Sequence, residues 1–466
     1  MTSKSKVALF LFASIAAIFF GLASLMMLNL AGQHYNYLLS LPLFFVIAIL
    51  FFLDRQLFFL LIILTRASLD APLDSIKLGT FGLGAVLNAL VIIIAFLAIL
   101  EKKPKLTNDL DWVKKSWAIF LILSFISLFY APKLLPSVKV FLLYVSYSSM
   151  LYLGLYLVKS ENDFGKWMKA IFYSSVIPVT YGLYCLAFGG QGGLRLSVEE
   201  GLRLQSTFNH PNSFSFYLVL IITITFYIYK TKPSYFNTTV LKVLPIYIIT
   251  LLGLLLMTKT RAAWAACGLF FLLYGLIFER KFLIVLFFAS FLALLIPDVQ
   301  HRLLDLQQGT NWGATGYERL NSYAWRIKYW TDALHWMSVK HYIQGYGLHS
   351  FTHFSTSFGM GNAHHLQTVE INAHSVYVLL FFELGILGLL AFLFIIFSHL
   401  KALIKIYSYN KFLVFTVIVV LVEFLFECYS DNMLDYLNFD WYLWFLIGLT
   451  LSYVNLSKNP SKYKNV

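Results

Sequence analysis

Long apolar runs are the feature that most constrains how this chain can fold. A helix that crosses a bilayer needs about 20 predominantly apolar residues, and an open sheet cannot satisfy its backbone groups in lipid. We therefore predict helical spans near 7–30, 37–53, 82–100, 115–131, 137–158, 164–188, 213–229, 240–257, 261–278, 282–297, 373–399, 411–428 and 440–456. The shorter run 56–66 is added because the sides of the neighbouring loops require a crossing there. The expected fold is an all-α polytopic membrane protein, a single integral membrane domain over residues 1–466 with about 12–14 transmembrane helices.

The composition supports a membrane protein and excludes most soluble classes. Hydrophobic residues make up 59% of the chain and charged residues only 12%, about half the charged fraction of a typical soluble domain. So much apolar surface could not be hidden from water by soluble domains. The run 7–30 is too long for the apolar core of a signal peptide and lacks a small-residue cleavage pattern, so we expect it to be a retained first span.

The basic residues predict the orientation of the spans. With an inner N-terminus, 22 of the 35 lysine and arginine residues fall on the inner side, as cytoplasmic loops require. This placement accounts for the net charge of +13 without nucleic acid as a partner. We expect a multi-pass protein of the bacterial inner membrane with both termini in the cytoplasm.

Two outer segments are longer than simple connections. They are 189–212 and the large loop 298–372, and loops longer than about 15 residues are usually functional or disordered. The second is too rich in aromatic residues for disorder. Its segment 318–337 has the pattern of an amphipathic helix at the membrane interface, with aromatic side chains at headgroup depth. These side chains belong to Tyr323, Trp325, Tyr329, Trp330 and Trp336.

Arginines on the outer side are the first candidates for chemistry, because topology does not require positive charge there. They are Arg195, Arg203, Arg261 and Arg326. A guanidinium group presents a rigid fork of donors that fits phosphate oxygens, and an enzyme with a lipid-diphosphate donor needs such groups to hold the leaving diphosphate. The alternative is that they anchor lipid headgroups or pair with nearby acidic residues.

Histidines are concentrated in the large outer loop. Eight of the 11 lie between His301 and His374, but no spacing among them matches a zinc signature, so we predict no metal site. His374 differs from the others because it stands at the outer mouth of the predicted span 373–399. A neutral imidazole there could accept the proton of an attacking sugar hydroxyl. The alternative is a structural cap of the helix.

Four segments with these residues resemble the superfamily of O-antigen ligases and O-antigen polymerases, bacterial enzymes of surface polysaccharide. His374-Ser375, nine residues and then Gly385-Ile386-Leu387-Gly388 resemble the ligase-type pattern of His, then Asn, Ser or Gln, nine residues and Gly-x-x-Gly. The other three segments are 203-RLQSTFNHPN-212, 260-TRAAWAA-266, and the series Arg326, Trp330 and Gly345-Tyr346-Gly347. Together they cover residues 203–399.

The resemblance implies a GT-C-like membrane glycosyltransferase without a metal or other cofactor. It implies that His374 activates the acceptor and that Arg261 and Arg326 handle the diphosphate. Further substrate-binding candidates are Arg203, Arg195, Trp330 and Glu383. Glu383 is an intramembrane carboxylate, but in a continuous helix it would lie about 13 Å along the axis from His374 and on the opposite face, so we do not expect a simple dyad. Gly385 would lie on nearly the same face as His374, and Gly388 would admit a neighbouring helix.

The implied reaction transfers a glycan from an undecaprenyl-diphosphate-linked oligosaccharide to an acceptor sugar hydroxyl on the outer face, with inversion. Chain length and span count favour a polymerase, whose acceptor is another lipid-linked glycan. A ligase that uses lipid A–core is the alternative, and transfer to a protein hydroxyl is less favoured. A lipid-glycan transporter would carry charges at midplane, whereas here the span centres are nearly free of charge. The implied partners also include membrane lipids and a chain-length regulator.

Overall fold

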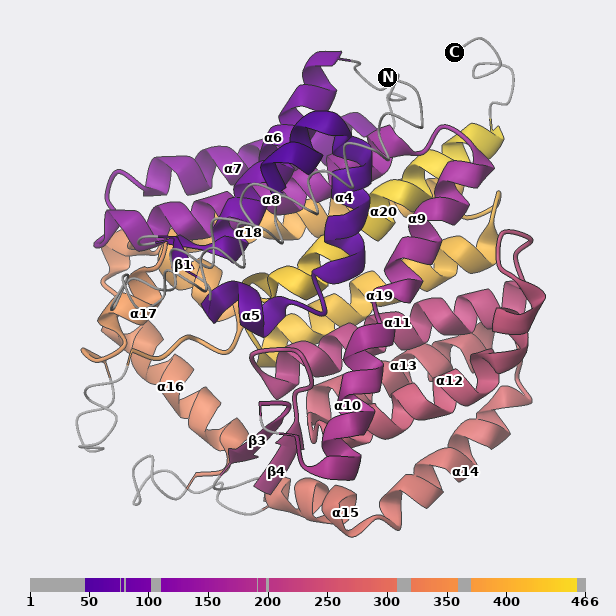
Figure 1. Cartoon of the computed structure of the whole chain (residues 1–466). Coiled ribbons are helices and arrows are strands. Elements are labelled where there is room, and N and C mark those ends of the chain that lie inside the picture. Colours follow the sequence, from indigo (N-terminus) through magenta and orange to yellow (C-terminus); the bar gives the residue numbers. More distant parts are fainter. Residues whose placement is uncertain are drawn as a thin grey trace, which may run out of the picture.

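Helices make up nearly all of the ordered secondary structure of the protein (Figure 1). The computed structural model describes residues 47–75, 77–78, 81–101, 110–190, 192–197, 201–307, 320–358 and 370–458. In chain order the α-helices are α4 (Arg55–Thr65), α5 (Asp70–Ser75), α6 (Leu83–Glu101), α7 (Asp111–Ser127), α8 (Leu134–Leu157), α9 (Glu161–Tyr173), α10 (Val176–Phe188), α11 (Pro211–Thr231), α12 (Thr238–Met257), α13 (Arg261–Ile277), α14 (Phe282–Leu294), α15 (Pro297–Leu304), α16 (Ser322–Trp336), α17 (Ser350–Phe354), α18 (Val376–Ile406), α19 (Lys411–Ser430) and α20 (Leu437–Lys458).

Short elements occupy some of the connections between these helices. Three 3-10 helices are present, η3 (Asp305–Gln307), η4 (Val339–His341) and η5 (Met433–Asp435). Two antiparallel hairpins pair β1 (Lys77–Leu78) with β2 (Phe81–Gly82) and β3 (Leu194–Ser197) with β4 (Gly201–Leu204). The second hairpin lies inside the segment 189–212, which the sequence pattern predicts only as a loop.

The helices confirm an all-helical polytopic membrane protein. Seven helices of the described chain are long and apolar enough to cross a membrane, or eight if α14 and α15, bent by 87°, form one broken span. Helices α4 and α13 are apolar but shorter. The predicted span 7–30 lies outside the described residues, and the total of 12–14 spans and the orientation of the termini stay predictions.

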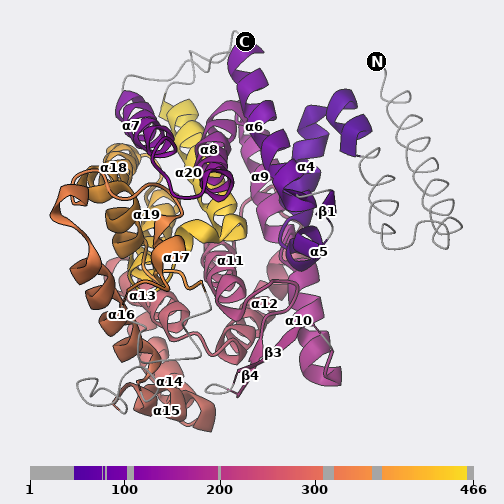
Figure 2. The same cartoon turned by 90° about the vertical axis from the view of Figure 1, so that its left-hand side faces the viewer.

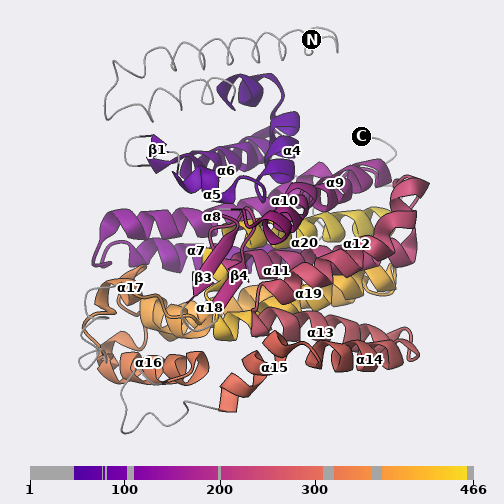
Figure 3. The same cartoon turned by 60° about the horizontal axis from the view of Figure 1, so that its bottom comes forward.

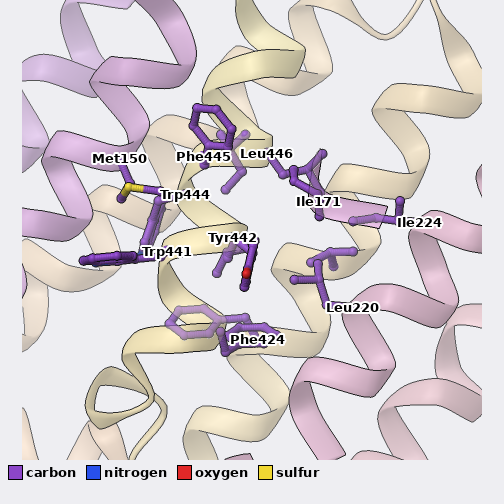
Figure 4. Packing of buried hydrophobic residues seen from close by; sticks show 14 of the residues in the cluster. Met150, Ile171, Leu220, Ile224, Phe424, Trp441, Tyr442, Trp444, Phe445 and Leu446 are labelled. Carbon is purple, nitrogen blue, oxygen red and sulfur yellow. The ribbon is translucent and has the colours of Figure 1, made fainter. Parts of the chain in front are cut away.

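The centre of the bundle is built around α11 and α20. Every residue of α11 from Ser213 to Ile228 is buried, as expected for a helix that is apolar on all sides and surrounded by protein. Aromatic side chains of α20, among them Tyr442 and Trp444, point into the packed interior beside residues of α8, α9, α11 and α19 (Figure 4). Because the core of the bundle holds α11 on all sides, the first turn of this helix has a fixed position.

The predicted span 373–399 is a broken helix. Gly385 has φ 64° and ψ −166° inside α18, a conformation that L side chains rarely adopt. The break allows the backbone of residues 382–387 to form hydrogen bonds with the backbone of residues 342–347. The Tyr346 N–H donates to the Phe382 carbonyl at 3.0 Å, and the Ile386 N–H donates to the Tyr342 carbonyl at 2.8 Å. A face counted along a continuous helix therefore does not apply to Gly385 or to the residues that follow it, whereas Glu383 precedes the break.

Glycines make this contact possible. A Cβ at Gly345 would lie 2.3 Å from the backbone carbon of Glu383, and one at Gly385 would lie 2.2 Å from the Ile343 carbonyl oxygen. A Cβ at Gly388 would meet Leu384 of the same helix rather than a neighbouring helix. We name the contact between residues 342–347 and residues 382–387 the glycine clasp. Two of the glycines that carry the family resemblance, Gly345 and Gly385, thus join the outer loop to α18.

The predicted helix within 318–337 is confirmed as α16, but its aromatic residues pack against protein. Tyr329 and Trp330 are buried, and Tyr329 joins a cluster with Phe351 of α17 and Phe382 of α18. Figure 3 shows α16 and α17 beside this end of α18. The depth of Tyr329 and Trp330 relative to the lipid headgroups stays a prediction, but the helices of the loop cover both side chains, so they contact protein.

Candidate active site

His374 occupies the turn that leads into α18, in a strained backbone conformation. Its φ is 50°, and a non-glycine residue held in the left-handed region costs about 1–3 kcal/mol. Its imidazole is partly exposed, with Trp325 packed edge-on at 5.9 Å between ring centroids. Such strain persists only where the surroundings hold the residue in place.

Both neighbours of His374 are held by side chains from other elements. The indole N–H of Trp330, on α16, donates to the Ala373 carbonyl at 2.6 Å. On the other side, Ser375 N–H donates to Oδ1 of Asn432 at 3.0 Å. Trp330 is thus a buried support for the turn rather than an exposed side chain.

Asp431 is the carboxylate that faces His374. It caps α19, is 3% exposed, and places Oδ1 3.8 Å from Nδ1 of His374. The hydroxyl of Tyr436 donates to the same oxygen at 2.9 Å, while Asn212 Nδ2 donates to Oδ2 at 2.6 Å. The network continues to Arg203, whose Nη2 donates to Oδ1 of Asn212 at 2.7 Å.

These contacts keep Asp431 ionised. Burial by itself would raise the pKa of its carboxyl group, but the charges of His374 and Arg326 and the hydrogen bond from Asn212 outweigh burial and hold that pKa well below its usual value. A fixed negative charge therefore stands behind Nδ1 of His374 at any physiological pH.

Glu423 and Glu427 lie on α19, the helix that Asp431 caps, and the Asp431 N–H donates to the Glu427 carbonyl at 2.9 Å. The carboxyl oxygens of both glutamates are buried and have no hydrogen-bond partner in the described part of the chain.

Four arginines converge on a cavity of about 80 Å³ beside Asp431. We name it the arginine pocket. Its polar lining consists of Arg203, Arg261, Arg302, Arg326, Asn212, Thr260, Ser322, Ser430 and Asp431. These residues come from β4, α11, α13, α15, α16 and the end of α19. Figures 1 and 2 show α15, α16 and the β3–β4 hairpin gathered at one end of the helix bundle.

Three of the arginines are fixed by bonds to the protein. Arg302 donates from Nη2 to the Lys259 carbonyl at 3.1 Å. Arg203 donates from Nε to the Thr258 carbonyl at 2.8 Å and is buried. Arg261, the first residue of α13, donates from Nη1 to Oδ2 of Asp305 at 2.9 Å and from Nη2 to the hydroxyl of Ser322. Their guanidinium groups are thus held in place at the pocket wall.

Arg326 differs from these three. It lies one residue after Trp325, which packs on His374, and it lines the pocket with no hydrogen bond or ion pair to any of the described residues. A guanidinium group without hydrogen-bond partners keeps its donors available for a ligand.

Not all of the residues predicted from the sequence lie at the arginine pocket or beside His374. Arg195 pairs with Arg203 across the hairpin but is exposed and outside the pocket lining. Glu383 is buried at the glycine clasp, where its Oε1 accepts the Phe351 N–H at 3.3 Å. Arg302 belongs to the pocket and was missed, although its outer position after the span 282–297 satisfies the criterion that selected the others. Asp431 was found, but its contact with His374 was not.

Part of the amino-acid sequence matches a known protein family. Residues 246–393 match the O-antigen ligase family model. The match confirms the predicted resemblance, and it includes Arg261, Arg326 and His374. A comparison of the chain with curated proteins finds no match.

The O-antigen ligase match fixes the broad chemistry of this membrane protein. It implies a glycan-transferring enzyme of a bacterial envelope family, with lipid-linked glycans as substrates. Arg203 and Asp431 lie outside the matched residues, so only the folded structure connects them to the O-antigen ligase segment. No group of three or more metal-ligating side chains occurs among the residues with described positions.

Proposed function

We propose that the protein transfers a glycan from an undecaprenyl-diphosphate donor to a sugar hydroxyl of an acceptor on the outer face of the membrane. The observation that carries this proposal is the position of Asp431. One carboxylate lines the arginine pocket and also faces His374, so a diphosphate in the pocket lies beside the imidazole.

The arginine pocket is suited to a diphosphate because its charge is strongly positive. Four guanidinium groups line it, against the carboxylate of Asp431 in the lining and that of Asp305, which pairs with Arg261 and Arg302. Arg203 and Arg261 are preorganised, and Arg326 keeps its donors for the ligand. Preorganised donors aimed at a developing negative charge stabilise the transition state without reorganising during the reaction. The proposed transfer therefore needs no metal ion to neutralise the leaving group.

His374 acts as the general base in this proposal. With Nδ1 directed at Asp431, Nε2 is the nitrogen available to the acceptor. The acceptor oxygen attacks the anomeric carbon while its proton passes to Nε2. The bond between the anomeric carbon and the diphosphate oxygen breaks, and its electron pair leaves with the lipid diphosphate. A single displacement of this kind inverts the anomeric centre.

The acceptor separates two versions of the proposal. The polymerase version is favoured by chain length and span count, and the total number of spans stays a prediction, since the seven or eight candidate spans were found in the described residues only. The ligase version, with lipid A–core as acceptor, is favoured by the description of the matching family. We take the ligase version as the one to test first.

The test uses the purified full chain in lipid nanodiscs with a radiolabelled lipid-diphosphate glycan donor. Three reactions contain lipid A–core, excess unlabelled donor glycolipid, or no second acceptor. Label that moves to lipid A–core supports a ligase, and label that accumulates in longer lipid-linked glycans supports a polymerase. Absence of transfer to either acceptor would contradict the proposal.

A further inference from the structure

A second cavity is connected through side chains to the residues that face His374. Its volume is about 750 Å³, and its wall includes Tyr436 and His210. Tyr436 donates its hydroxyl to Asp431 of the arginine pocket, and His210 caps the same helix that carries Asn212 into that pocket. We name this space the α6–α8 cavity, because residues of α6 and α8 form much of its wall.

Three residues in the wall of the α6–α8 cavity carry buried polar atoms that lack a hydrogen-bond partner. These atoms are Nε and Nη1 of Arg66, Oδ1 of Asn88 and Oδ1 of Asn438. None has a hydrogen-bond partner among the residues that the structure describes, and all three side chains are more than nine-tenths buried. Leaving such groups unsatisfied destabilises the protein. A ligand with several hydrogen-bonding groups that reaches them would remove this penalty.

The charges of the cavity are nearly balanced, unlike those of the arginine pocket. Nη2 of Arg66 pairs with Asp70 at 3.2 Å, and Lys139 and Asp435 add one charge of each sign. Burial lowers the pKa of His210 to about 4, so its imidazole is neutral at physiological pH. Its Nδ1 accepts the Asn212 N–H at 3.1 Å, as a neutral ring can. The cavity therefore suits hydroxyl and amide groups better than a diphosphate.

The remaining wall is apolar and belongs to two candidate membrane spans. Ala85 and Ala89 lie four residues apart on α6, and Leu142 lies on α8; all three side chains are exposed. The small side chains of α6 leave space between the two helices, which otherwise pack against each other. A hydrocarbon chain could lie there while its headgroup reaches Asn88 and Asn438.

We propose that the α6–α8 cavity binds the acceptor, a glycolipid whose sugar headgroup meets Arg66, Asn88 and Asn438 and whose apolar chain lies between α6 and α8. This inference rests on the proposed function, since it brings the acceptor to His374. Two acceptors fit this description, lipid A–core and a polyprenyl-linked glycan. Both carry a hydroxyl-rich sugar on a lipid.

The experiment measures binding to the full chain in nanodiscs. Farnesyl diphosphate reports on the arginine pocket. The two acceptor probes are lipid A with core sugars and N-acetylglucosaminyl-diphosphate-farnesol, the second measured with saturating farnesyl diphosphate. Ala89→Trp fills the cavity, and Ala289→Trp on α14, a helix with no buried residues, is the matched control. Asn88→Ala tests the polar end without adding bulk.

We expect wild type to bind one of the two glycolipids, which identifies the source of the acceptor. Ala89→Trp should weaken that binding about tenfold or more and leave farnesyl diphosphate binding unchanged, because bulk in a fitted pocket costs more than 1 kcal/mol. Asn88→Ala should weaken it less, and Ala289→Trp should have no effect.

Two results would show that the cavity does not bind the acceptor: wild type binds neither glycolipid, or Ala89→Trp binds the glycolipid as tightly as wild type does. A third result, in which Ala89→Trp weakens the binding of farnesyl diphosphate equally, would assign the cavity to the donor and would also overturn the inference. Failure of the proposed function is distinguishable from these results. In that case Arg326→Ala would keep wild-type affinity for farnesyl diphosphate, while the glycolipid arm would still report on the α6–α8 cavity.

Discussion

Different kinds of contact hold two regions of the molecule together, the crossing of α8 and α20 and the surroundings of His374. At the crossing, Gly154 and Gly448 let the helices touch: a Cβ at Gly448 would lie 2.3 Å from the Leu151 carbonyl oxygen. Around His374, side chains hold the backbone of a left-handed residue through hydrogen bonds. The crossing is held by apolar contact between regular helices, and the active site by polar contact between loops.

This difference assigns separate roles to the two regions. Close packing of spans is the contact that stabilises helices in a membrane, and nothing at the crossing touches the arginine pocket. The network of His374, Asp431 and Asn212 instead fixes where protons and charges lie. We therefore expect substitutions at the site to reduce turnover and substitutions at the crossing to reduce stability.

His374→Gln is the strongest test of the site. Glutamine keeps approximate size and polarity but cannot accept the acceptor's proton, so kcat should fall by about two to four orders of magnitude. Donor affinity and thermal stability should remain near wild type. Wild-type turnover in this variant would show that His374 only caps α18.

Arg326→Ala should have the next largest effect on transfer. Loss of one preorganised donor at a developing negative charge lowers kcat about 10²–10³-fold. Arg326→Lys should restore little, since a point charge does not reproduce the bidentate fork. Lys328→Ala, two residues along α16 and paired with Asp332, is the matched control and should transfer normally.

Asp431→Asn should reduce transfer about ten- to hundredfold, because the base remains but loses its orienting carboxylate. Asp431 is ionised over the whole physiological range, so its own titration does not shape the pH profile there. The loss should appear in kcat measured with saturating donor, because the carboxylate orients the base. Wild-type kcat in Asp431→Asn would argue that the two groups are not coupled.

Gly448→Ala should act on stability instead of turnover. Its methyl group would overlap backbone of α8, and overpacking of this kind costs about 1–3 kcal/mol. A lowered unfolding temperature with normal kcat for the surviving protein is expected. Gly268→Ala on α13, where an added Cβ meets no atom within 4 Å, should leave the unfolding temperature unchanged or raise it.

Trp330→Phe should give the smallest change. It removes one hydrogen bond to the Ala373 carbonyl, worth about 1 kcal/mol, so kcat should fall roughly fivefold. Because Trp330 supports the turn and lies outside the pocket lining, the donor KM should stay constant. A rise in donor KM at constant kcat would instead indicate direct contact with substrate.

Sequence reasoning identified those site residues whose charge or polarity is unexpected at their place in the chain. Arg203, Arg261 and Arg326 were selected as positive charges that topology does not require, and His374 as a polar residue at the mouth of a long apolar run. The structure brings the three arginines together in one pocket and places Asp431 between that pocket and His374.

The parts that sequence reasoning missed depend on contacts between distant segments. The break at Gly385 arises from pairing with residues 342–347, and the two glycines of the apolar run 373–399 do not by themselves predict it. Asp431 follows two acidic residues at helical spacing, and only the folded turn shows that it faces His374. Arg302 reaches the pocket because the chain turns by 87° between α14 and α15.

The central claim is that the arginine pocket holds the diphosphate of the lipid donor beside His374. The most direct test is an experimental structure, by electron cryo-microscopy, of the full chain in nanodiscs with undecaprenyl diphosphate. We predict diphosphate density bounded by Arg261 and Arg326, with His374 and Asp431 alongside and the lipid chain leading away from the α6–α8 cavity. Diphosphate density within the α6–α8 cavity, or an arginine pocket that stays empty when the lipid occupies another site, would contradict the account.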